Sequence, residues 1–414
     1  MSDRAVFFDP SRRRWWWIKG IAALVALIAA VLIGFWAVSL FIVTPMLPGM
    51  PGITTALQHT LRPSAHFPRH QTRVQLFLAR RAREKLLAQI AHDRAKKKPP
   101  PPPVKGSTGI VAAFYAPWQE TGLHSLQANA SRMTHVLPAW VHLQENAAGL
   151  DLHDWDPVQT PHNLEVLEIA RTNNVNVVPV FSNAQQGEFD PQRVHRFLNE
   201  IPLQLRLIND LRHWCLTNHF QGINVDFENL QPEDYAQLIP FLRRLKQSFA
   251  PANLQISVDL EAHRPENWKA AADLCNFVVV MAYDEHSSTG AAGPIASIPW
   301  YRDVIQRAVK TIPRDKLVVG LANYAYDWTE GENWADPITY QQALLRGQEF
   351  RVGEKPETIV DFDPAALNPT LWYVDDEGKE HEIWFLDAVT AANQWLIAQN
   401  YGARNVAIWV LGST

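Results

Sequence analysis

The sequence predicts an α/β protein, a (β/α)8 TIM barrel with an α+β insertion after its seventh strand, preceded by a single transmembrane helix. Short apolar segments rich in Val and Ile alternate with helical patterns over about 300 residues, as in a barrel. The segments are nearly continuous in apolar residues, which is typical of parallel strands buried on both faces. A doubly wound open sheet is the main alternative. It usually begins with a Gly-rich first turn, which this sequence does not have.

Eight strands are expected from Gly109 onward. They are Ile110–Tyr115, Thr134–Trp140, Val175–Phe181, Gly222–Phe227, Leu254–Leu260, Phe277–Tyr283, Lys316–Leu321 and Asn405–Val410. Helical patterns lie between them, including Asn163–Thr172, Asp190–Asn218 and Pro232–Phe249. This alternation predicts the barrel.

The connection after the seventh strand, about residues 324–383, is too long for a simple loop and is expected to have structure of its own. Leu371–Val374 and Glu380–Phe385 form a predicted hairpin within it. We expect this hairpin to stand beside the mouth of the barrel as one wall of a cleft.

Composition sets broad limits. The chain has 414 residues, 47% of them hydrophobic, and a formal net charge of −4. It can bury one large core or two smaller ones, and its charge does not indicate nucleic acid binding. Its 16 Trp residues are many, which is typical of sugar stacking or a membrane interface. Cys215 and Cys275 are expected to be buried free thiols. No metal or nucleotide motif appears, so no cofactor is predicted.

The N-terminal part has the pattern of a membrane anchor. Residues 1–17 form a basic segment expected in the cytoplasm, and residues 18–44 hold the predicted transmembrane helix. From Ile21 to Val43 the chain is apolar except for Ser39, and no small-residue cleavage site follows. A retained anchor is therefore preferred over a removed signal peptide. The region from Arg62 to Lys98 is also basic, which argues against outward orientation, but it lies well past the helix.

Residues 45–106 are predicted to be a basic helical spacer and a Pro-rich linker. Apolar residues from Val74 to Ile90 recur at helical spacing among Arg and Lys. This pattern fits an amphipathic helix on anionic lipid as well as a solvated spacer. The run from Pro99 to Pro103 is a stiff linker, and less plausibly a ligand for a proline-binding domain. The folded domain is expected at 107–414.

The most informative stretch runs from residue 221 to 230. Its polar and apolar side chains alternate, as on a strand with two unlike faces. The polar face holds Asn224, Asp226 and Glu228, and the apolar face, expected to pack outward, holds Ile223, Val225 and Phe227. A half-exposed strand with a polar side is the plain alternative. Because unpaired buried charge is costly, we interpret Asp226 and Glu228 as a catalytic acid and its helper.

The carboxyl ends of barrel strands face the active site. The groups expected at this rim are Tyr115, Asn183, Asp226, Glu228, Met281, Tyr283, Asp284 and Trp409. An acid, a carboxylate helper, a Tyr hydroxyl and an aromatic floor suit glycoside chemistry. Each has a plain alternative when taken singly: Trp409 as core, for example, or Tyr283 as a strand cap. Their joint arrival at one rim favours a site.

Several motifs together resemble family 18 glycoside hydrolases, the chitinase-like family. They are Gly222-x-Asn224-x-Asp226-x-Glu228, Met281-Ala282-Tyr283-Asp284, Asn323–Trp328, Trp384–Ala388 and Ala407–Gly412. The resemblance covers residues 107 to 414. Phe181-Ser182-Asn183, with Asn224 in place of Asp, is most similar to the branch with spore-coat and peptidoglycan-associated members.

The resemblance implies a substrate-assisted mechanism. Glu228 is expected to protonate the leaving oxygen, Asp226 to orient the substrate's acetamido group, and Tyr283 to hydrogen-bond its carbonyl. The expected substrate-binding residues are Asn224, Met281, Asp284, Trp409, Tyr115 and Asn183. The sequence departs from the family pattern at Gln221 and Asn224, where the family has Asp. We therefore expect no coupled carboxylate, and an ionised Asp226 held by the Asn224 amide.

The layout of the chain resembles the start of bacterial proteins that fuse such a hydrolase to a polysaccharide deacetylase and a membrane glycosyltransferase. It implies fused or associated modules of those kinds, a chain continuing past Thr414, and a bacterial inner membrane protein with a periplasmic domain. A different class of function is a non-catalytic glycan-binding module that assists polysaccharide synthesis or export. A purely structural anchor leaves the polar rim unexplained.

Overall fold

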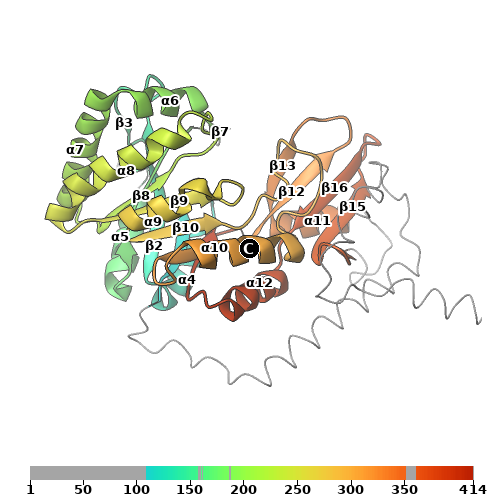
Figure 1. The fold of residues 1–414 in the computed structure, drawn as a ribbon. Coiled ribbons are helices and arrows are strands. Elements are labelled where there is room, and N and C mark those ends of the chain that lie inside the picture. The colour runs from blue at the N-terminus through green and yellow to red at the C-terminus, as the bar shows by residue number, and fades with distance from the viewer. Residues whose placement is uncertain (1–108, 157–159, 161, 186–187, 351–359, 414) are drawn as a thin grey trace, which may run out of the picture. The chain divides into compact units, whose positions relative to one another are not determined.

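The computed structural model describes residues 109–156, 160, 162–185, 188–350 and 360–413 (Figure 1). Three predicted segments lie outside these residues: the cytoplasmic segment 1–17, the transmembrane helix 18–44, and the helical spacer and Pro-rich linker 45–106. None of the helices in the described ranges is both long and apolar enough to cross a membrane.

Eight parallel strands close into a barrel, as predicted. They are β1 (Val111–Tyr115), β2 (His135–Leu143), β5 (Val180–Ser182), β8 (Gly222–Asp226), β9 (Gln255–Glu261), β10 (Phe277–Met281), β11 (Leu317–Ala322) and β17 (Asn405–Trp409). Each pairs in parallel with the next, and β1 pairs with both β2 and β17, which closes the ring. The third predicted strand is divided into β4 (Asn176–Val177) and β5, on either side of Pro179. Proline has no N–H to donate to the ladder.

Helices cover the outside of the barrel (Figure 1). They are α4 (Gly122–Asn129), α5 (His162–Asn173), α6 (Pro191–Asn199), α7 (Ile201–Thr217), α8 (Tyr235–Phe249), α9 (Trp268–Leu274), α10 (Ile298–Thr311) and α12 (Ala388–Asn400). The single helix predicted at Asp190–Asn218 is two helices, α6 and α7. Pro202 lies in the first turn of α7, where a missing N–H is tolerated, and it could not continue the preceding helix.

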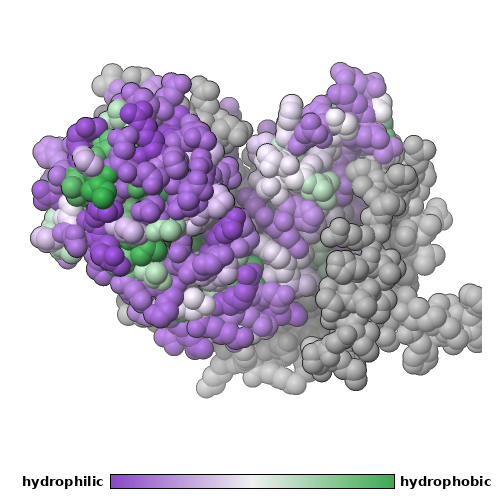
Figure 2. Space-filling view, turned by 45° about the horizontal axis from the view of Figure 1, so that its top comes forward, coloured by the Kyte–Doolittle hydropathy of each residue, from purple (hydrophilic) through white to green (hydrophobic). Residues whose placement is uncertain are grey.

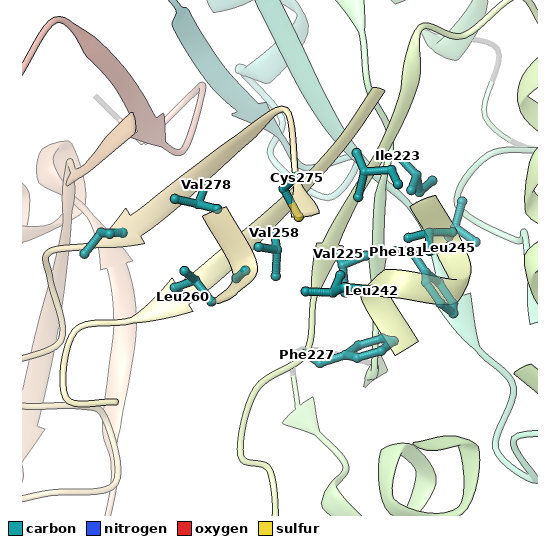
Figure 3. Close-up of a cluster of buried hydrophobic side chains, with 14 of the residues drawn as sticks. Phe181, Ile223, Val225, Phe227, Leu242, Leu245, Val258, Leu260, Cys275 and Val278 are labelled. Carbon is teal, nitrogen blue, oxygen red and sulfur yellow. The ribbon is translucent and has the colours of Figure 1, made fainter. Parts of the chain in front are cut away.

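The core between strands and helices follows the predicted alternation. Ile223, Val225 and Phe227 are buried and lie on the side of β8 that faces Leu242 and Leu245 of α8 (Figure 3). Both cysteines are buried and free, as predicted, and burial raises the pKa of each thiol to about 12. Such thiols are unreactive. The outward packing of β8 leaves its polar residues facing into the barrel.

The insertion after β11 is an antiparallel sheet with one helix. Its order is β13 (Ala335–Thr339), β12 (Tyr324–Thr329), β16 (Glu380–Phe385), β15 (Asn368–Val374) and β14 (Asp361–Asp363), with α11 (Tyr340–Phe350). The predicted hairpin is confirmed, since β15 and β16 pair from Thr370–Trp384 to Val374–Glu380.

The insertion is fixed to the barrel by apolar packing. Trp328 and Trp384 of the insertion lie in one buried cluster with Met281 and Tyr283 of the barrel. The Trp328 indole also donates a hydrogen bond to the Gly290 carbonyl, 3.1 Å away, in the segment after β10. The face shown in Figure 2 is mostly hydrophilic, and it is hollowed where the barrel meets the insertion.

Candidate active site

The polar face of β8 lies inside the barrel. Gly222 begins the strand, and a Cβ there would come within 2.1 Å of the Gln255 carbonyl oxygen, so glycine is needed for β8 to lie against β9. Asn224 and Asp226 are buried, with 0% and 5% of their surfaces exposed, and Glu228 follows the strand end half-buried. Asn229 then turns the chain with a φ of 55°, a conformation that Asn tolerates.

Asn183 positions the backbone of Glu228. Its side-chain oxygen accepts a 3.0 Å hydrogen bond from the Glu228 N–H, and its amide donates at 2.9 Å to the Glu228 carbonyl. The residue is completely buried. Asn183 was expected to bind substrate; the structure instead turns both ends of its amide toward protein backbone, where it fixes the position of Glu228.

Strand β9 brings carboxyl groups that the sequence analysis missed. Asp259, 6% exposed, accepts a 2.6 Å hydrogen bond from the Asn224 side-chain amide, and Ser257 donates to the Asn224 oxygen at 2.6 Å. The expectation that the Asn224 amide holds Asp226 is therefore wrong, because that amide is directed to Asp259. Glu261, two residues on, accepts a 2.6 Å hydrogen bond from the Tyr235 hydroxyl.

Strand β10 and the insertion form the next wall. Met281 and Tyr283 are buried, and Tyr283 lies against β11 at Gly320, where a Cβ would be 3.0 Å from the tyrosine ring. Asp284 follows with a φ of 58°, and its carboxylate accepts a hydrogen bond from the Tyr324 hydroxyl of β12. These groups come together from two parts of the chain.

The last strand contributes an aromatic surface. Trp409 is half-buried, and its ring meets that of Phe114 edge to face at 5.2 Å. Tyr115 was expected at the site, but alternation along β1 puts Phe114 inward and Tyr115 outward. Tyr115 belongs to the cluster between strands and helices, and its ring comes within 3.3 Å of the Cβ position of Gly122 on α4. The expected role of Tyr115 in binding is not compatible with this position.

On the other side of β8, His142 connects two strands to a partly buried loop. Its Nδ1 is 2.8 Å from Ser182 Oγ, and its Nε2 is 3.0 Å from Asp154 Oδ2. Sheet register places His142, Ser182 and Asp226 at one level on three neighbouring strands. His142 thus lies at the level of Asp226 in the sheet, and the sequence pattern did not point to it.

Burial dominates the electrostatics. It raises the pKa of Asp226 to about 7, with the Glu261 charge adding to the shift, and a hydrogen bond with Glu228 and the charge of His142 opposing it. Burial also raises the pKa of Glu228 well above its ordinary value, and the charges of Asp226, Asp284, Glu261 and Asp259 add to this. The raised pKa favours the protonated form of Glu228, which is the form that a general acid requires.

The Tyr283 hydroxyl lies among the same charges. Burial, followed by the charges of Asp259, Glu228, Asp226 and Asp284, raises its pKa well above the ordinary value. It remains a hydrogen-bond donor at all working pH values. Across the described ranges, no group of three or more His, Cys, Asp or Glu side chains is placed to hold a metal ion.

A signal for the missed residues was present in the sequence. The β9 segment Gln255–Glu261 has polar residues Ser257, Asp259 and Glu261 at alternate positions, the same pattern that singled out β8. Two adjacent strands with inward-facing carboxylates predict one shared site.

Comparison with known proteins identifies relatives of this chain. The chain is 28% identical over 261 residues to a Bacillus subtilis (strain 168) cortical fragment-lytic enzyme, covering 59% of this chain and 58% of that protein. It is 26% identical over 227 residues to human di-N-acetylchitobiase, covering 47% and 58%. The chain thus spans under two thirds of the length of both.

Two solved structures share the fold. The Bacillus megaterium QM B1551 spore cortex-lytic enzyme SleL superposes with a TM-score of 0.61 and 26% identity, over 73% of this chain and 71% of that chain. A Chromobacterium violaceum chitinase gives a TM-score of 0.64 at 19% identity, over 74% and 95%. The family model for glycosyl hydrolases family 18 matches residues 110–413. The chain therefore belongs to glycosyl hydrolases family 18, the enzyme family its motifs predicted.

Proposed function

We propose that this protein hydrolyses β-linked N-acetylglucosamine-containing glycans by acid catalysis in which the substrate's acetamido group is the nucleophile. The observation that carries this proposal is the Glu228 carboxyl, kept protonated by burial and by the surrounding carboxylates. The names of the relatives, a cortical fragment-lytic enzyme and a di-N-acetylchitobiase, support an N-acetylated glycan as the substrate class.

In the first step the Glu228 proton passes to the glycosidic oxygen as the bond from that oxygen to the anomeric carbon breaks. The acetamido carbonyl oxygen bonds to the anomeric carbon and forms an oxazolinium ion. Asp226, ionised, orients the acetamido N–H and stabilises the positive charge. The Tyr283 hydroxyl donates to the acetamido oxygen.

In the second step the Glu228 carboxylate removes a proton from water, and that water attacks the anomeric carbon. The oxazolinium ring opens, and Glu228 is protonated again. Asp284, Met281 and Trp409 line the site and are proposed to contact the sugar. Asn224 acts indirectly, through its hydrogen bonds with Asp259 and Ser257.

A glycan-binding module without catalysis is the second candidate. It would need neither a protonated acid nor a tyrosine hydroxyl among four carboxyl groups. Since both are present, hydrolysis accounts for more of the site than binding does.

We also propose a periplasmic location, with the barrel held at a bacterial inner membrane by residues 18–44 and joined to or associated with deacetylase and glycosyltransferase modules. The support is the apolar run from Ile21 to Val43 and the Pro-rich linker in the sequence. Fractionation of cells, with protease added to intact spheroplasts, tests this proposal. Release of the protein into the soluble fraction would contradict it.

The test of the reaction compares full-length wild type with Glu228→Gln on N-acetylglucosamine oligosaccharides and on peptidoglycan strands. Removing a general acid is expected to lower kcat by about 10²–10⁴. Mass spectrometry of the products gives the readout. Glu266→Gln, an exposed carboxylate in the same domain, is the matched control. Binding without cleavage by the wild type would favour the glycan-binding module.

A further inference from the structure

The barrel holds a pair of buried carboxyl groups, of which the proposed reaction uses one. Asp226 has a role there, but Asp259, on the neighbouring strand, has none. Asp259 is 6% exposed, and its contact with Asn224 ties it to the strand that carries the acid.

Strand register places the two aspartates side by side. Asn224 is paired with Ser257, and Val225 with Val258, in a parallel ladder. Two residues beyond the first of these pairs, β8 reaches Asp226 and β9 reaches Asp259. Side chains at corresponding positions of neighbouring parallel strands point to the same face of the sheet, so both carboxyl groups enter the barrel at one level.

Each carboxyl group has an oxygen with no partner. Oδ1 of Asp226 and Oδ1 of Asp259 are both buried and have no hydrogen-bond partner within the described part of the chain. A buried carboxylate oxygen without a donor is costly. Two such oxygens on neighbouring groups can be satisfied together if one proton lies between the carboxyl groups, and the charge on one buried carboxylate disfavours ionisation of its neighbour.

We propose that Asp259 supplies the carboxyl group that Asn224 lacks, by sharing one proton with Asp226. Asn224 is then the holder of Asp259, accepting from Ser257 and donating to Asp259 Oδ2. When the positive charge develops on the substrate, the shared proton stays on Asp259 and the negative charge on Asp226. Asp259 is a positioning residue, and this role rests on the proposed function of Asp226.

Other titratable groups face this pair from the surrounding strands. They are Glu228 after β8, Glu261 on β9, Tyr283 and Asp284 after β10, and His142 on β2. Of these, only His142 can bring a positive charge, and its two ring nitrogens already contact Ser182 and Asp154. Consistent with one retained proton, burial and the charge of Asp226 raise the pKa of Asp259 well above its ordinary value.

The test moves the second carboxyl group from position 259 on β9 to position 224 on β8. Asp259→Asn removes it, keeps the shape of the side chain, and cannot hold or return the shared proton. Asn224→Asp in the Asp259→Asn background restores a second carboxyl group on β8. Asp273→Asn, an exposed aspartate on α9, is the matched control. Full-length protein is used throughout, and circular dichroism checks that each variant is folded.

The first readout does not require activity. The infrared band of protonated carboxyl groups is followed from acid to alkaline pH. Wild type is expected to keep one protonated aspartate above about pH 7, where Asp226 on its own ionises. The Asp259→Asn variant should lose that signal, and the double variant should regain it. Persistence of the signal in Asp259→Asn, or its absence from wild type or from the folded double variant, would overturn the proposal.

The second readout is the pH profile of hydrolysis. Asp259→Asn is expected to lower kcat by about tenfold or more, because Asp226 is no longer held in position by the shared proton. KM is expected to stay nearly unchanged. The double variant should recover most of kcat together with the wild-type profile. An unchanged kcat and pH profile in Asp259→Asn would refute the positioning role. If no variant or wild type hydrolyses glycans while the infrared pattern holds, the shared proton stands and the proposed function fails.

Discussion

Two regions of this protein bury aspartates, and they treat the charge in opposite ways. In the insertion, Asp327 is 1% exposed and is surrounded by partners. Arg346 donates to Oδ2, the Tyr373 hydroxyl donates to the same oxygen at 2.8 Å, and His381 Nδ1 is 2.9 Å from Oδ1. The negative charge is compensated on every side.

In the barrel, Asp226 and Asp259 are almost as deeply buried, but each leaves one oxygen unpaired within the described residues. Carboxylates surround them in place of cations, and burial raises both pKa values. Asp327, whose charge is compensated, stabilises the fold, whereas Asp226 and Asp259, whose charges are not, lower stability. Carboxyl groups kept at such a cost are the mark of a catalytic site.

The largest effect on stability is expected in the insertion. Asp327→Ala leaves Arg346 and His381 facing each other without the carboxylate, which is expected to lower the free energy of unfolding by about 3–5 kcal/mol. Urea unfolding measures this loss. Asp375→Asn serves as the control: it removes the charge of a partly exposed partner of His381, keeps an oxygen to accept from the Glu377 and Lys379 N–H groups, and should cost about 1 kcal/mol or less. An equal loss of unfolding free energy in both variants would show that Asp327 is not held more strongly than an exposed carboxylate, and would contradict the contrast between the two regions.

The next effect concerns pH. Because burial raises the pKa of Asp226 from 3.8 to about 7, the folded state binds that proton more tightly than the unfolded state. The contribution of Asp226 to stability therefore falls as pH rises from about 4 to about 7, by a few kcal/mol on the order expected for such a shift.

Urea unfolding of wild type and Asp226→Asn across that pH range measures this contribution. The variant should become progressively more stable than wild type as pH rises. Curves that stay parallel would show that Asp226 titrates as it does in the unfolded chain.

A smaller effect is expected at the tyrosine hydroxyl. Tyr283→Phe removes the proposed donor to the acetamido oxygen and is expected to lower kcat by about tenfold or more, while the fold is retained. Tyr301→Phe is the matched control, because the Tyr301 hydroxyl is also buried and has no hydrogen-bond partner among the described residues. Steady-state kinetics of both variants give the comparison. Equal activity of Tyr283→Phe and wild type would exclude the hydroxyl from the reaction.

The smallest effect is expected at Tyr115, which was predicted to lie at the site but lies outside it. Tyr115→Phe should leave kcat and KM within about twofold of wild type, since the side chain lies between strand and helix. A substantial rise in KM would mean that β1 presents Tyr115 to the substrate after all.

The sequence was sufficient for the barrel and for the centre of the site. Runs such as Phe277–Met281 are apolar enough to mark buried parallel strands, and the alternation at Asn224, Asp226 and Glu228 marks an inward polar face. Such patterns depend only on neighbours along the chain. The proposed acid, Glu228, could therefore be singled out from the sequence alone.

Contacts between strands were harder to predict from the sequence. Whether Asn224 holds Asp226 or Asp259 depends on the register of β8 and β9, which one strand alone does not contain. Phe114 and Tyr115 are adjacent aromatics, and either could face the site until the alternation of β1 is known. The burial of Asn183 likewise follows from how its loop packs on Glu228.

The most direct test of the contrast between the two regions measures activity and stability of one variant, Asp226→Asn, at a pH above 7. We expect kcat to fall by about 10²–10³ while the free energy of unfolding rises above that of wild type. A variant that is less stable than wild type, or one that hydrolyses glycans at the wild-type rate, would contradict the claim that the barrel keeps its buried carboxyl groups for catalysis.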